Sequence, residues 1–513
     1  MHVPLTTQDF LARASLSYAA SAALVDEPGP FQDGGLGRLT YGQLAKRARA
    51  MAAGLDARGM ARGSRIAVLS HNSGRLLESF FGVTSWGRVL VPVNFRLARP
   101  EIRYIVEHSG ADLLLVDPEV RDSVDQDLGI PVLMLGEESD AALMAPGEDP
   151  RPWADPDETA TATINYTSGT TARPKGVQLT HRNLWVNAVT FALHTAVTDR
   201  DVYLHTLPMF HANGWGMPFA LTGLGVQQVV LRKVDGDDIL ARVRDHGVTL
   251  MCGAPAVLAA VIEAAQKWDG PVPGAGRVRV VCAGAPPPTR IIEEVENRLG
   301  WELIQIYGLT ETSPLLTINR RRARDDERSS NERARRLSRA GTPALGVTLQ
   351  VAEDGELLVR GNVVFESYWQ QPEETSQAQR DGWFHTGDGG HLDEEGFVTI
   401  VDRKKDVIIS GGENVSSIEV EDCLFSHPAV AEAAVISVPH EKWGETVKAV
   451  VVLKSGATAS PADLIAHCKA ALAGYKAPTS VDFVEALPRN ATGKVQKFKL
   501  REPYWAGRER LVN

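Results

Sequence analysis

The densest group of ligand-binding side chains lies between residues 166 and 176, where the chain reads YTSGTTARPKG. Its four hydroxyl-bearing residues after the tyrosine fall within five positions: Thr167, Ser168, Thr170 and Thr171. Gly169 would let the backbone approach a ligand closely, and Lys175 supplies a mobile positive charge. Such a loop can surround a polyphosphate with N–H groups and hydroxyls. A polar surface turn is the alternative that this composition allows, and the spacing of a Walker A loop is absent.

The loop needs strands on either side to hold it, and the sequence predicts them. Apolar Ile164 and the run from Val177 indicate a strand, a loop and a second strand. A helix is predicted from the capping-box spacing of residues 40–43. Short apolar strands follow helical patterns repeatedly, at residues 65–69, at 102–106 with 112–116, and at 240–243 with 249–252. This repetition predicts a parallel, doubly wound α/β sheet.

A second unit is predicted from about residue 406 to the C-terminus. A hairpin over 407–415, with its turn at 410–413, precedes strands at 430–438 and 446–453 and a helix at 462–472. These patterns indicate a compact α+β domain of ordinary size.

Length and composition exclude several classes of protein. The 513 residues exceed a single core, and the 43% hydrophobic and 23% charged fractions are ordinary for a globular enzyme. A net charge of −10 argues against general nucleic-acid binding. No run of 18 or more apolar residues predicts a membrane span, and the N-terminus lacks the pattern of a signal peptide. Cys252 and Cys282 lie in apolar stretches as expected of core residues, and the cysteine usage fits a reducing cytoplasm.

Residues 319–339 are unusually rich in charge, with nine arginines and four acids. We expect a solvated loop or an exposed helix here. A contact for an anionic partner is the alternative.

The whole chain resembles the adenylate-forming superfamily, which includes acyl-CoA synthetases, adenylation domains of peptide synthetases and beetle luciferases. The resemblance begins with the loop at 166–176 and continues through further segments in the family's order, over more than 300 residues. Those segments are Pro208–His211, Ala283–Pro286, Tyr307–Glu311, His385–Asp388, Asp402–Asp406 and Asn490–Lys494. The resemblance implies a large N-terminal domain of doubly wound, mixed or parallel sheets with helices (1–402), a hinge (403–405) and a small mobile α+β lid domain (406–513).

The reaction implied by the resemblance has two steps. A carboxylate attacks the α-phosphate of ATP to give an acyl-adenylate and pyrophosphate, and a thiol, usually that of CoA, then expels AMP. Two anions meet in the first step, so Mg²⁺ and lysine are expected to neutralise the phosphates.

The resemblance also assigns roles to single residues. Lys494 matches the lysine that bridges the carboxylate and the α-phosphate, Glu311 the Mg²⁺ ligand, and Thr310 a hydroxyl on the α-phosphate. Asp388 would accept both ribose hydroxyls. The remaining nucleotide-binding positions by the same match are Thr167, Ser168, Gly169, Thr170, Thr171, Lys175, Gly284, Ala285, Pro286, Tyr307, Gly308 and Arg403.

The same match predicts which residues contact the acid and CoA. His211 resembles the gate between the acyl pocket and the thiol tunnel, although a hydrogen-bonded core histidine is the alternative. The pocket wall would include Gly214, Trp215, Gly216, Ala283 and Gly284, whose uncharged character predicts a hydrophobic acid. Lys405 matches the hinge residue of a rotating domain. The positions expected to contact CoA are Gly411, Gly412, Trp443, Tyr475 and Lys476, although Ala477 and Thr479 replace basic residues found in some ligases.

The chain departs from the family at position 172, where alanine replaces the usual glycine. If that position needs a positive φ, alanine costs about 1 kcal/mol and could weaken binding of the ATP phosphates. An enzyme that chiefly uses a preformed acyl-adenylate is therefore an alternative to a complete CoA ligase. A second alternative loads a carrier protein, with residues 319–339 as the basic patch.

Two further alternatives belong to other classes. One is a nucleotide-binding protein that has lost catalysis. The presence of Lys494, Glu311 and Asp388, the residues predicted to be functional, argues against it. The other is a luciferase-like oxygenase, which the motifs alone do not separate from a ligase. The sequence leaves the oligomeric state open, with a homodimer among the alternatives.

Overall fold

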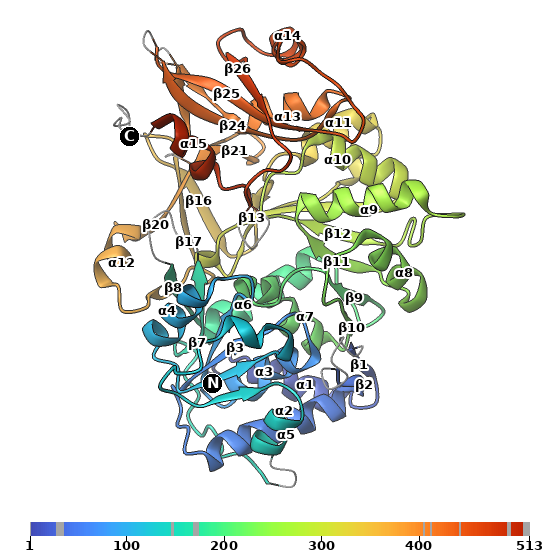
Figure 1. The fold of residues 1–513 in the computed structure, drawn as a ribbon. Helices are drawn as coiled ribbons and strands as arrows, with labels where there is room; N and C mark the ends of the chain where they lie inside the picture. The colour runs from blue at the N-terminus through green and yellow to red at the C-terminus, as the bar shows by residue number, and fades with distance from the viewer. Residues whose placement is uncertain are drawn as a thin grey trace.

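The protein forms a large N-terminal domain and a smaller C-terminal domain, which lies at the top of Figure 1 in orange and red. A computed structural model describes residues 2–26, 35–144, 148–167, 174–403, 406–410, 413–440, 443–489 and 494–505. The expected fold class, α/β with mixed sheets and a small second domain, is confirmed.

The first sheet has seven strands and a parallel centre. Its order is β18 (Ser367–Tyr368), β8 (Lys175–Thr180), β7 (Thr161–Thr167), β4 (Val89–Val93), β3 (Arg65–Leu69), β5 (Leu113–Val116) and β6 (Val132–Met134). β7–β8 and β8–β18 are antiparallel, and the other pairs are parallel. The central strands are nearly continuous apolar runs because helices cover both faces.

The second sheet has nine strands and is also parallel at its centre. Its order is β15 (Thr342–Pro343), β14 (Leu315–Asn319), β13 (Glu302–Gly308), β12 (Arg279–Cys282), β11 (Leu250–Gly253), β9 (Val202–His205), β10 (Gln227–Val230), β1 (Ala22–Asp26) and β2 (Gly37–Thr40). One apolar core joins residues of both sheets and the helices between them.

The helices of the N-terminal domain follow the strands in the expected alternation. They are α1 (Gln8–Ser17), α2 (Tyr41–Ala57), α3 (Gly74–Thr84), α4 (Arg99–Ser109), α5 (Glu137–Leu143), α6 (His181–Thr195), α7 (Met217–Leu224), α8 (Gly236–His246), α9 (Pro255–Lys267), α10 (Thr289–Glu294), α11 (Ser330–Leu337) and α12 (Pro372–Ala378). Short irregular helices are η1 (Pro118–Ser123), η2 (His211–Gly216), η3 (Val295–Leu299), η4 (Thr310–Thr312) and η5 (Ala323–Asp325).

The local signals read from the sequence are confirmed in this domain. Thr40 Oγ1 accepts from Gln43 N at 3.3 Å, and Gln43 Oε1 accepts from Thr40 N at 2.8 Å, so the capping box opens α2. β3 covers the predicted range 65–69, and α4–β5 and α8–β11 lie where helix and strand were expected. Cys252 and Cys282 are fully buried core residues with free thiols.

A third, antiparallel sheet was not expected from the sequence. It orders β16 (Val347–Val351), β17 (Glu356–Gly361), β20 (Trp383–Leu392) and β19 (Gln379–Arg380), and β21 (Val398–Arg403) pairs with β20. β21 ends at the segment where the hinge is predicted. The last strand of the N-terminal domain therefore belongs to this sheet, and the chain passes from it into the C-terminal domain.

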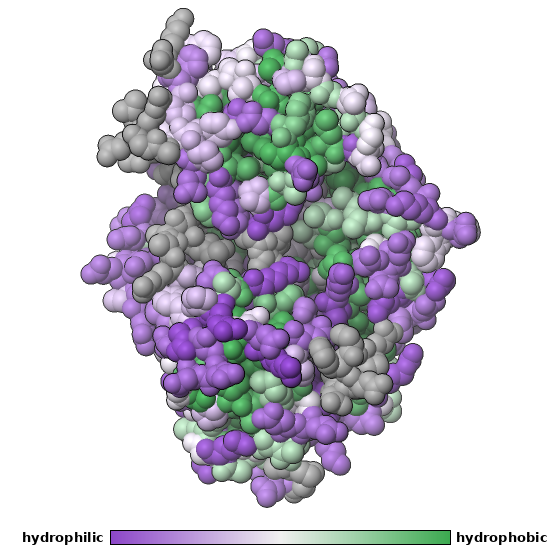
Figure 2. Space-filling model, viewed as in Figure 1, coloured by the Kyte–Doolittle hydropathy of each residue, from purple (hydrophilic) through white to green (hydrophobic). Residues whose placement is uncertain are grey.

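The C-terminal domain packs helices on a five-stranded sheet. Its elements are β22 (Ile408–Ser410), β23 (Glu413–Val415), α13 (Ser417–Ser426), β24 (Val430–His440), β25 (Gly444–Leu453), α14 (Pro461–Ala471), β26 (Ser480–Phe483) and α15 (Lys497–Trp505). The hairpin strands, the strands at 430–438 and 446–453 and the helix at 462–472 lie close to their predicted ranges, whereas the helices at 417–426 and 497–505 and the strand at 480–483 were not expected from the sequence. The domain has its own apolar cores. Apolar side chains also gather on its visible surface (Figure 2).

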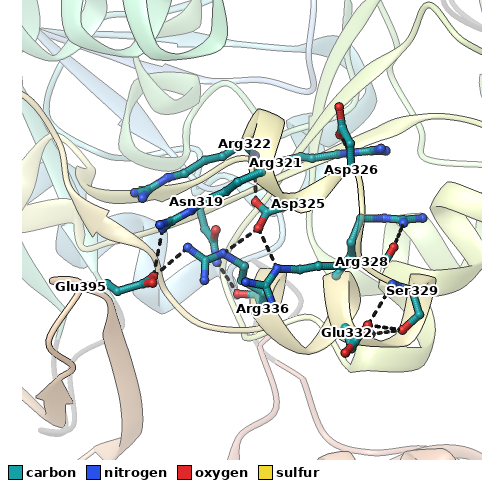
Figure 3. A network of polar contacts seen from close by, with 12 residues as sticks. Asn319, Arg321, Arg322, Asp325, Asp326, Arg328, Ser329, Glu332, Arg336 and Glu395 are labelled. Carbon is teal, nitrogen blue, oxygen red and sulfur yellow. Dashed lines mark hydrogen bonds and ion pairs between the residues drawn. The ribbon is translucent and has the colours of Figure 1, made fainter.

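The charge-dense segment 319–339 contains the partly exposed helix α11, and a polar network anchors it, so the expected solvated loop or exposed helix is confirmed only in part. Arg336 pairs with Asp325 at 3.1 Å and with Glu395 at 2.9 Å (Figure 3). The guanidinium groups of Arg336 and Arg339 lie 4.4 and 4.2 Å from the ring centroid of buried Phe397. The segment thus holds the turn between β20 and β21 instead of forming a purely solvated loop.

No helix among the described residues is both long and apolar enough to cross a membrane.

Candidate active site

The β7–β8 hairpin holds the predicted phosphate loop. Thr167 ends β7, Lys175 begins β8, and the two are partners in the antiparallel register. The two strands predicted on either side of the loop are therefore confirmed. The rest of the predicted loop lies outside the described residues, and its contacts stay predictions: Ser168, Gly169, Thr170, Thr171 and Ala172.

Tyr368 connects Lys175 to Glu311, the predicted metal ligand. Lys175 Nζ lies 4.9 Å from the centroid of the Tyr368 ring. The hydroxyl of Tyr368 donates to Glu311 Oε1 at 2.9 Å. β18 carries Tyr368 on the first sheet, whereas Glu311 lies in η4 after β13 of the second. One aromatic residue thus brings a cation and a carboxylate together, and no single-sequence signal marked it.

Tyr307 and Asp388 meet between the second and third sheets. The Tyr307 hydroxyl donates to Asp388 Oδ2 at 2.6 Å. Asp388 is only 4% exposed, and its backbone N–H donates to Thr386 Oγ1 at 3.1 Å. A Cβ on Gly308 would overlap the carbonyl oxygen of Pro314, so this position after Tyr307 requires glycine. The two predicted nucleotide contacts are therefore neighbours on rigid strands.

Arg403, another predicted nucleotide contact, is the register partner of Asp388 across β20 and β21. Its side chain lies outside the described part of the chain.

The segment after β12 meets the C-terminal lysine. Gly284 has a φ of +93°, and Gly284, Ala285 and Pro286 are solvent-exposed. The Cε atom of Lys494 lies 4.0 Å from the place that a Cβ on Gly284 would take. Thr310, beside Glu311 in η4, is buried. Lys494 therefore crosses from the lid domain to the region where nucleotide binding is predicted.

A left-handed backbone segment follows His211. Its positive φ values are 37° at Ala212, 50° at Asn213, 58° at Gly214 and 60° at Trp215. For residues other than glycine, this conformation costs about 1–2 kcal/mol each. Buried amides hold it: Asn213 Nδ2 donates to Thr163 Oγ1 at 2.8 Å, and Asn187 Nδ2 donates to Trp215 O at 3.2 Å. Such over-determined strain is common at functional sites.

His211 is kept neutral by its surroundings. Its burial lowers the pKa of the imidazole, and the positive charge of Lys494 lowers it further, to about 3. His211 retains some exposed area, yet the ring lies deep enough for lost hydration to dominate. A neutral ring can turn aside or donate one hydrogen bond without carrying a charge past an apolar substrate.

The predicted acyl wall is apolar. Ala212, Trp215 and Ala283 are buried and belong to one hydrophobic cluster with Met209 and Met217. Gly214 and Gly216 complete the backbone of the same turn and leave no side chain there.

Three of the predicted CoA contacts lie among the described residues of the C-terminal domain. Trp443 directly precedes β25, and Tyr475 and Lys476 lie in the turn before β26, which pairs with β25 in parallel. Both rings are exposed, at 43% and 48%. Lys476 pairs with Glu419 at 2.7 Å.

The remaining CoA positions, Gly411 and Gly412, and the hinge residue Lys405 lie outside the described residues.

Comparison with known proteins identifies the family of the chain. The model of the AMP-binding enzyme family matches residues 12–369, and that of the AMP-binding enzyme C-terminal domain matches residues 419–494. The 2-methylpropanoate–CoA ligase of Humulus lupulus is 36% identical, with 97% of this chain and 95% of the relative covered.

Two solved structures resemble the whole chain. One is the o-succinylbenzoate CoA synthetase of Bacillus subtilis with its acyl-adenylate intermediate, at 30% identity, a TM-score of 0.82, and 96% and 97% coverage of the two chains. The other is ATP-bound MatB from Rhodopseudomonas palustris, at 31% identity, a TM-score of 0.83, and 97% and 99% coverage. The chain therefore belongs to the adenylate-forming superfamily, as an AMP-binding enzyme of the acyl-CoA synthetase type and thus an acid-thiol ligase.

Proposed function

We propose that this enzyme activates an uncharged, hydrophobic carboxylic acid as its acyl-adenylate and transfers the acyl group to CoA, with rotation of the C-terminal domain between the two steps. The observation that carries the proposal is the position of Lys494. Its side chain reaches Gly284 from the other domain and acts electrostatically on His211. A positive charge there lies between the predicted adenine segment and the predicted acyl wall.

In the first step, a carboxylate oxygen of the acid forms a bond to the α-phosphorus of ATP, and the bond to pyrophosphate breaks. Lys494 would stabilise the charge that the two anions bring together. In the second step, the CoA thiol loses its proton as sulfur attacks the acyl carbonyl carbon. The bond to the AMP phosphate oxygen then breaks, and AMP leaves.

The chain's own residues would hold the nucleotide. Asp388, oriented by Tyr307, offers a carboxylate for the ribose hydroxyls. Thr310 and Lys175 would contact the phosphates, which positive charge and a hydroxyl donor suit chemically.

A Mg²⁺ ion fits the donors near the phosphates. Mg²⁺ commonly uses one or two carboxylates together with substrate phosphates, and Glu311 offers a half-buried carboxylate with one oxygen fixed by Tyr368. The ion would neutralise phosphate charge there. Among the described residues, no cluster of three or more acids, histidines or cysteines forms a metal site independent of substrate.

An aliphatic or aryl acid without a second charge suits the wall formed by Ala212, Trp215 and Ala283. The name of the Humulus relative, a ligase for 2-methylpropanoate, supports a small branched aliphatic acid as a first test substrate.

Rotation about residues 403–405 would exchange Lys494 for the segment around Gly411 and Gly412. Trp443, Tyr475 and Lys476 would then contact CoA. The domain limits at residues 402 and 406, the CoA positions, a homodimer and a cytoplasmic location stay predictions.

The carrier-loading alternative relied on the arginines of residues 319–339. Several of these are already paired, as Arg336 is with Asp325 and Glu395. This weakens the alternative, because paired arginines offer less charge to an acidic carrier.

The proposal is tested by measuring pyrophosphate release with ATP, Mg²⁺ and a panel of uncharged acids, beside acyl-CoA formation in the same mixtures. Release that requires one of these acids, followed by acyl-CoA, is the expected result. Acyl-CoA formed only from supplied acyl-adenylates would favour the enzyme fed with a preformed intermediate. Failure of both reactions with CoA would contradict the proposal.

A further inference from the structure

The first turn of α10 receives its capping acceptor from the other domain. α10 begins at Thr289, directly after Pro288, whose side chain makes no capping hydrogen bond. The first N–H groups of a helix have no intrahelical partners and need acceptors from elsewhere. The position that usually supplies one, the N-cap side chain, cannot do so here.

Asp422 supplies that acceptor from α13 of the C-terminal domain. Its Oδ1 accepts from Thr289 N at 2.9 Å, and its Oδ2 accepts from Thr289 Oγ1 at 3.0 Å. Both residues are half-buried. A carboxylate is also favoured beside the positive end of a helix. The two hydrogen bonds are therefore charge-assisted and fix one residue of each domain in a single geometry.

This contact and the Lys494 contact lie on the same loop-to-helix segment. Gly284, which Lys494 reaches, precedes Thr289 by five positions. The C-terminal domain thus meets this segment at two nearby points, one of them predicted to be catalytic. Because the two contacts lie so close together, we expect a rotation that withdraws Lys494 to separate α13 from α10 as well.

We propose that Asp422 and Thr289 form a latch that holds the C-terminal domain in the arrangement for acyl-adenylate formation. Asp422 acts as a positioning residue: it touches no substrate but keeps Lys494 at the site. Opening the latch leaves the first turn of α10 to water and frees the domain for the thiol step. The inference rests on the proposed two-step function and adds a residue that biases the enzyme toward its first step.

Four variants test the latch in the full chain: Asp422→Ala, Thr289→Val, the double variant, and Glu485→Ala as a matched control that removes an exposed carboxylate of the same domain. Each is measured in pyrophosphate release from ATP and acid without CoA. Each is also measured in acyl-CoA formation from supplied acyl-adenylate.

Asp422→Ala is expected to slow pyrophosphate release about tenfold, since bonds to a charged acceptor are the stronger ones. Acyl-CoA formation from supplied acyl-adenylate is expected to stay at the wild-type rate or to rise. Thr289→Val, which keeps the backbone N–H, has a smaller effect of about threefold. Thr289→Val is expected to have no further effect in the Asp422→Ala background, because among the described residues Asp422 is the one hydrogen-bond acceptor of the Thr289 hydroxyl. A fifth variant, Thr289→Ser, keeps the hydroxyl group and is expected to react at the wild-type rate.

Equal loss of both half-reactions in Asp422→Ala would show ordinary structural support and overturn the latch, as would two unchanged rates. Hydrogen exchange of the amides at 289–294 reads the contact without turnover. It is expected to accelerate in Asp422→Ala and not in Glu485→Ala, and unchanged exchange also overturns the latch. A wild-type enzyme that turns over no acid would count against the proposed function, while the exchange result still decides the latch.

Discussion

Replacing Gly216 by alanine tests whether the turn after His211 is built as the structure indicates. Gly216 has a φ of +78°, where a side chain costs about 1–2 kcal/mol. A Cβ there would also overlap Asn187 Nδ2. Asn187 is fully buried, donates to Trp215 O and accepts from Leu315 N at 3.1 Å. Displacing one of these bonds costs a further 1–3 kcal/mol or so, and the total is about 3 kcal/mol.

Gly247→Ala is the matched control for this prediction. Gly247 has a similar φ of +65°, but a Cβ there meets nothing within 4 Å. Its cost is the backbone strain alone, partly offset by a stiffer unfolded chain, so we expect about 1 kcal/mol or less. Thermal unfolding of the purified variants should give an apparent Tm lowered by about 3–4 °C for Gly216→Ala and by about 1 °C or less for Gly247→Ala, as expected for an N-terminal domain of about 400 residues. Equal shifts in the two variants would refute the reasoning, because they would show that Asn187 does not constrain the turn.

Three more perturbations have definite expected outcomes. Tyr368→Phe keeps the aromatic ring but removes the hydrogen bond that orients Glu311. The Mg²⁺ concentration for half-maximal pyrophosphate release should therefore rise about tenfold, with little change in Tm. An unchanged Mg²⁺ dependence would contradict this. Asp388→Asn should raise the KM for ATP about tenfold by removing a charged acceptor, and a KM within error of the wild type would exclude the ribose role. Burial lowers the pKa of His181 to about 3, so the unfolded chain gains a proton before the folded one as pH falls from about 6.5. Each pH unit below 6.5 should then lower the free energy of unfolding by about 1.4 kcal/mol. Urea unfolding of the wild type and of His181→Gln at pH 7.5 and 5.5 checks this. Between these two pH values the variant should lose about 1.4 kcal/mol less stability than the wild type, and equal losses would contradict the assignment.

The elements that could be predicted are those whose signals are local. The strand at 65–69 is buried on both faces and is therefore a short apolar run, and the Thr40–Gln43 box marks the start of α2 within four residues. The third sheet gave no such signal. β20 reads WFHTGDGGHL, and its three glycines are typical of a turn, although alternate residues at its start are buried.

The candidate site divides in the same way. The resemblance marked Lys494, Gly284, Tyr307 and Asp388, and the structure brings them together in pairs. Tyr368 was missed, since its contacts with Glu311 and Lys175 join residues that are distant in sequence. The contact of Asp422 with Thr289 spans 133 positions and depends on how two domains dock. No local pattern encodes such a contact.

The most direct measurement of the central claim compares the two half-reactions of Lys494→Ala with those of the wild type. If Lys494 acts where the structure places it, pyrophosphate release should fall by about 100-fold or more. Acyl-CoA formation from supplied acyl-adenylate should stay within about threefold, because the lysine is expected to leave the site before that step. Pyrophosphate release at the wild-type rate, or an equal loss of both half-reactions, would contradict the account.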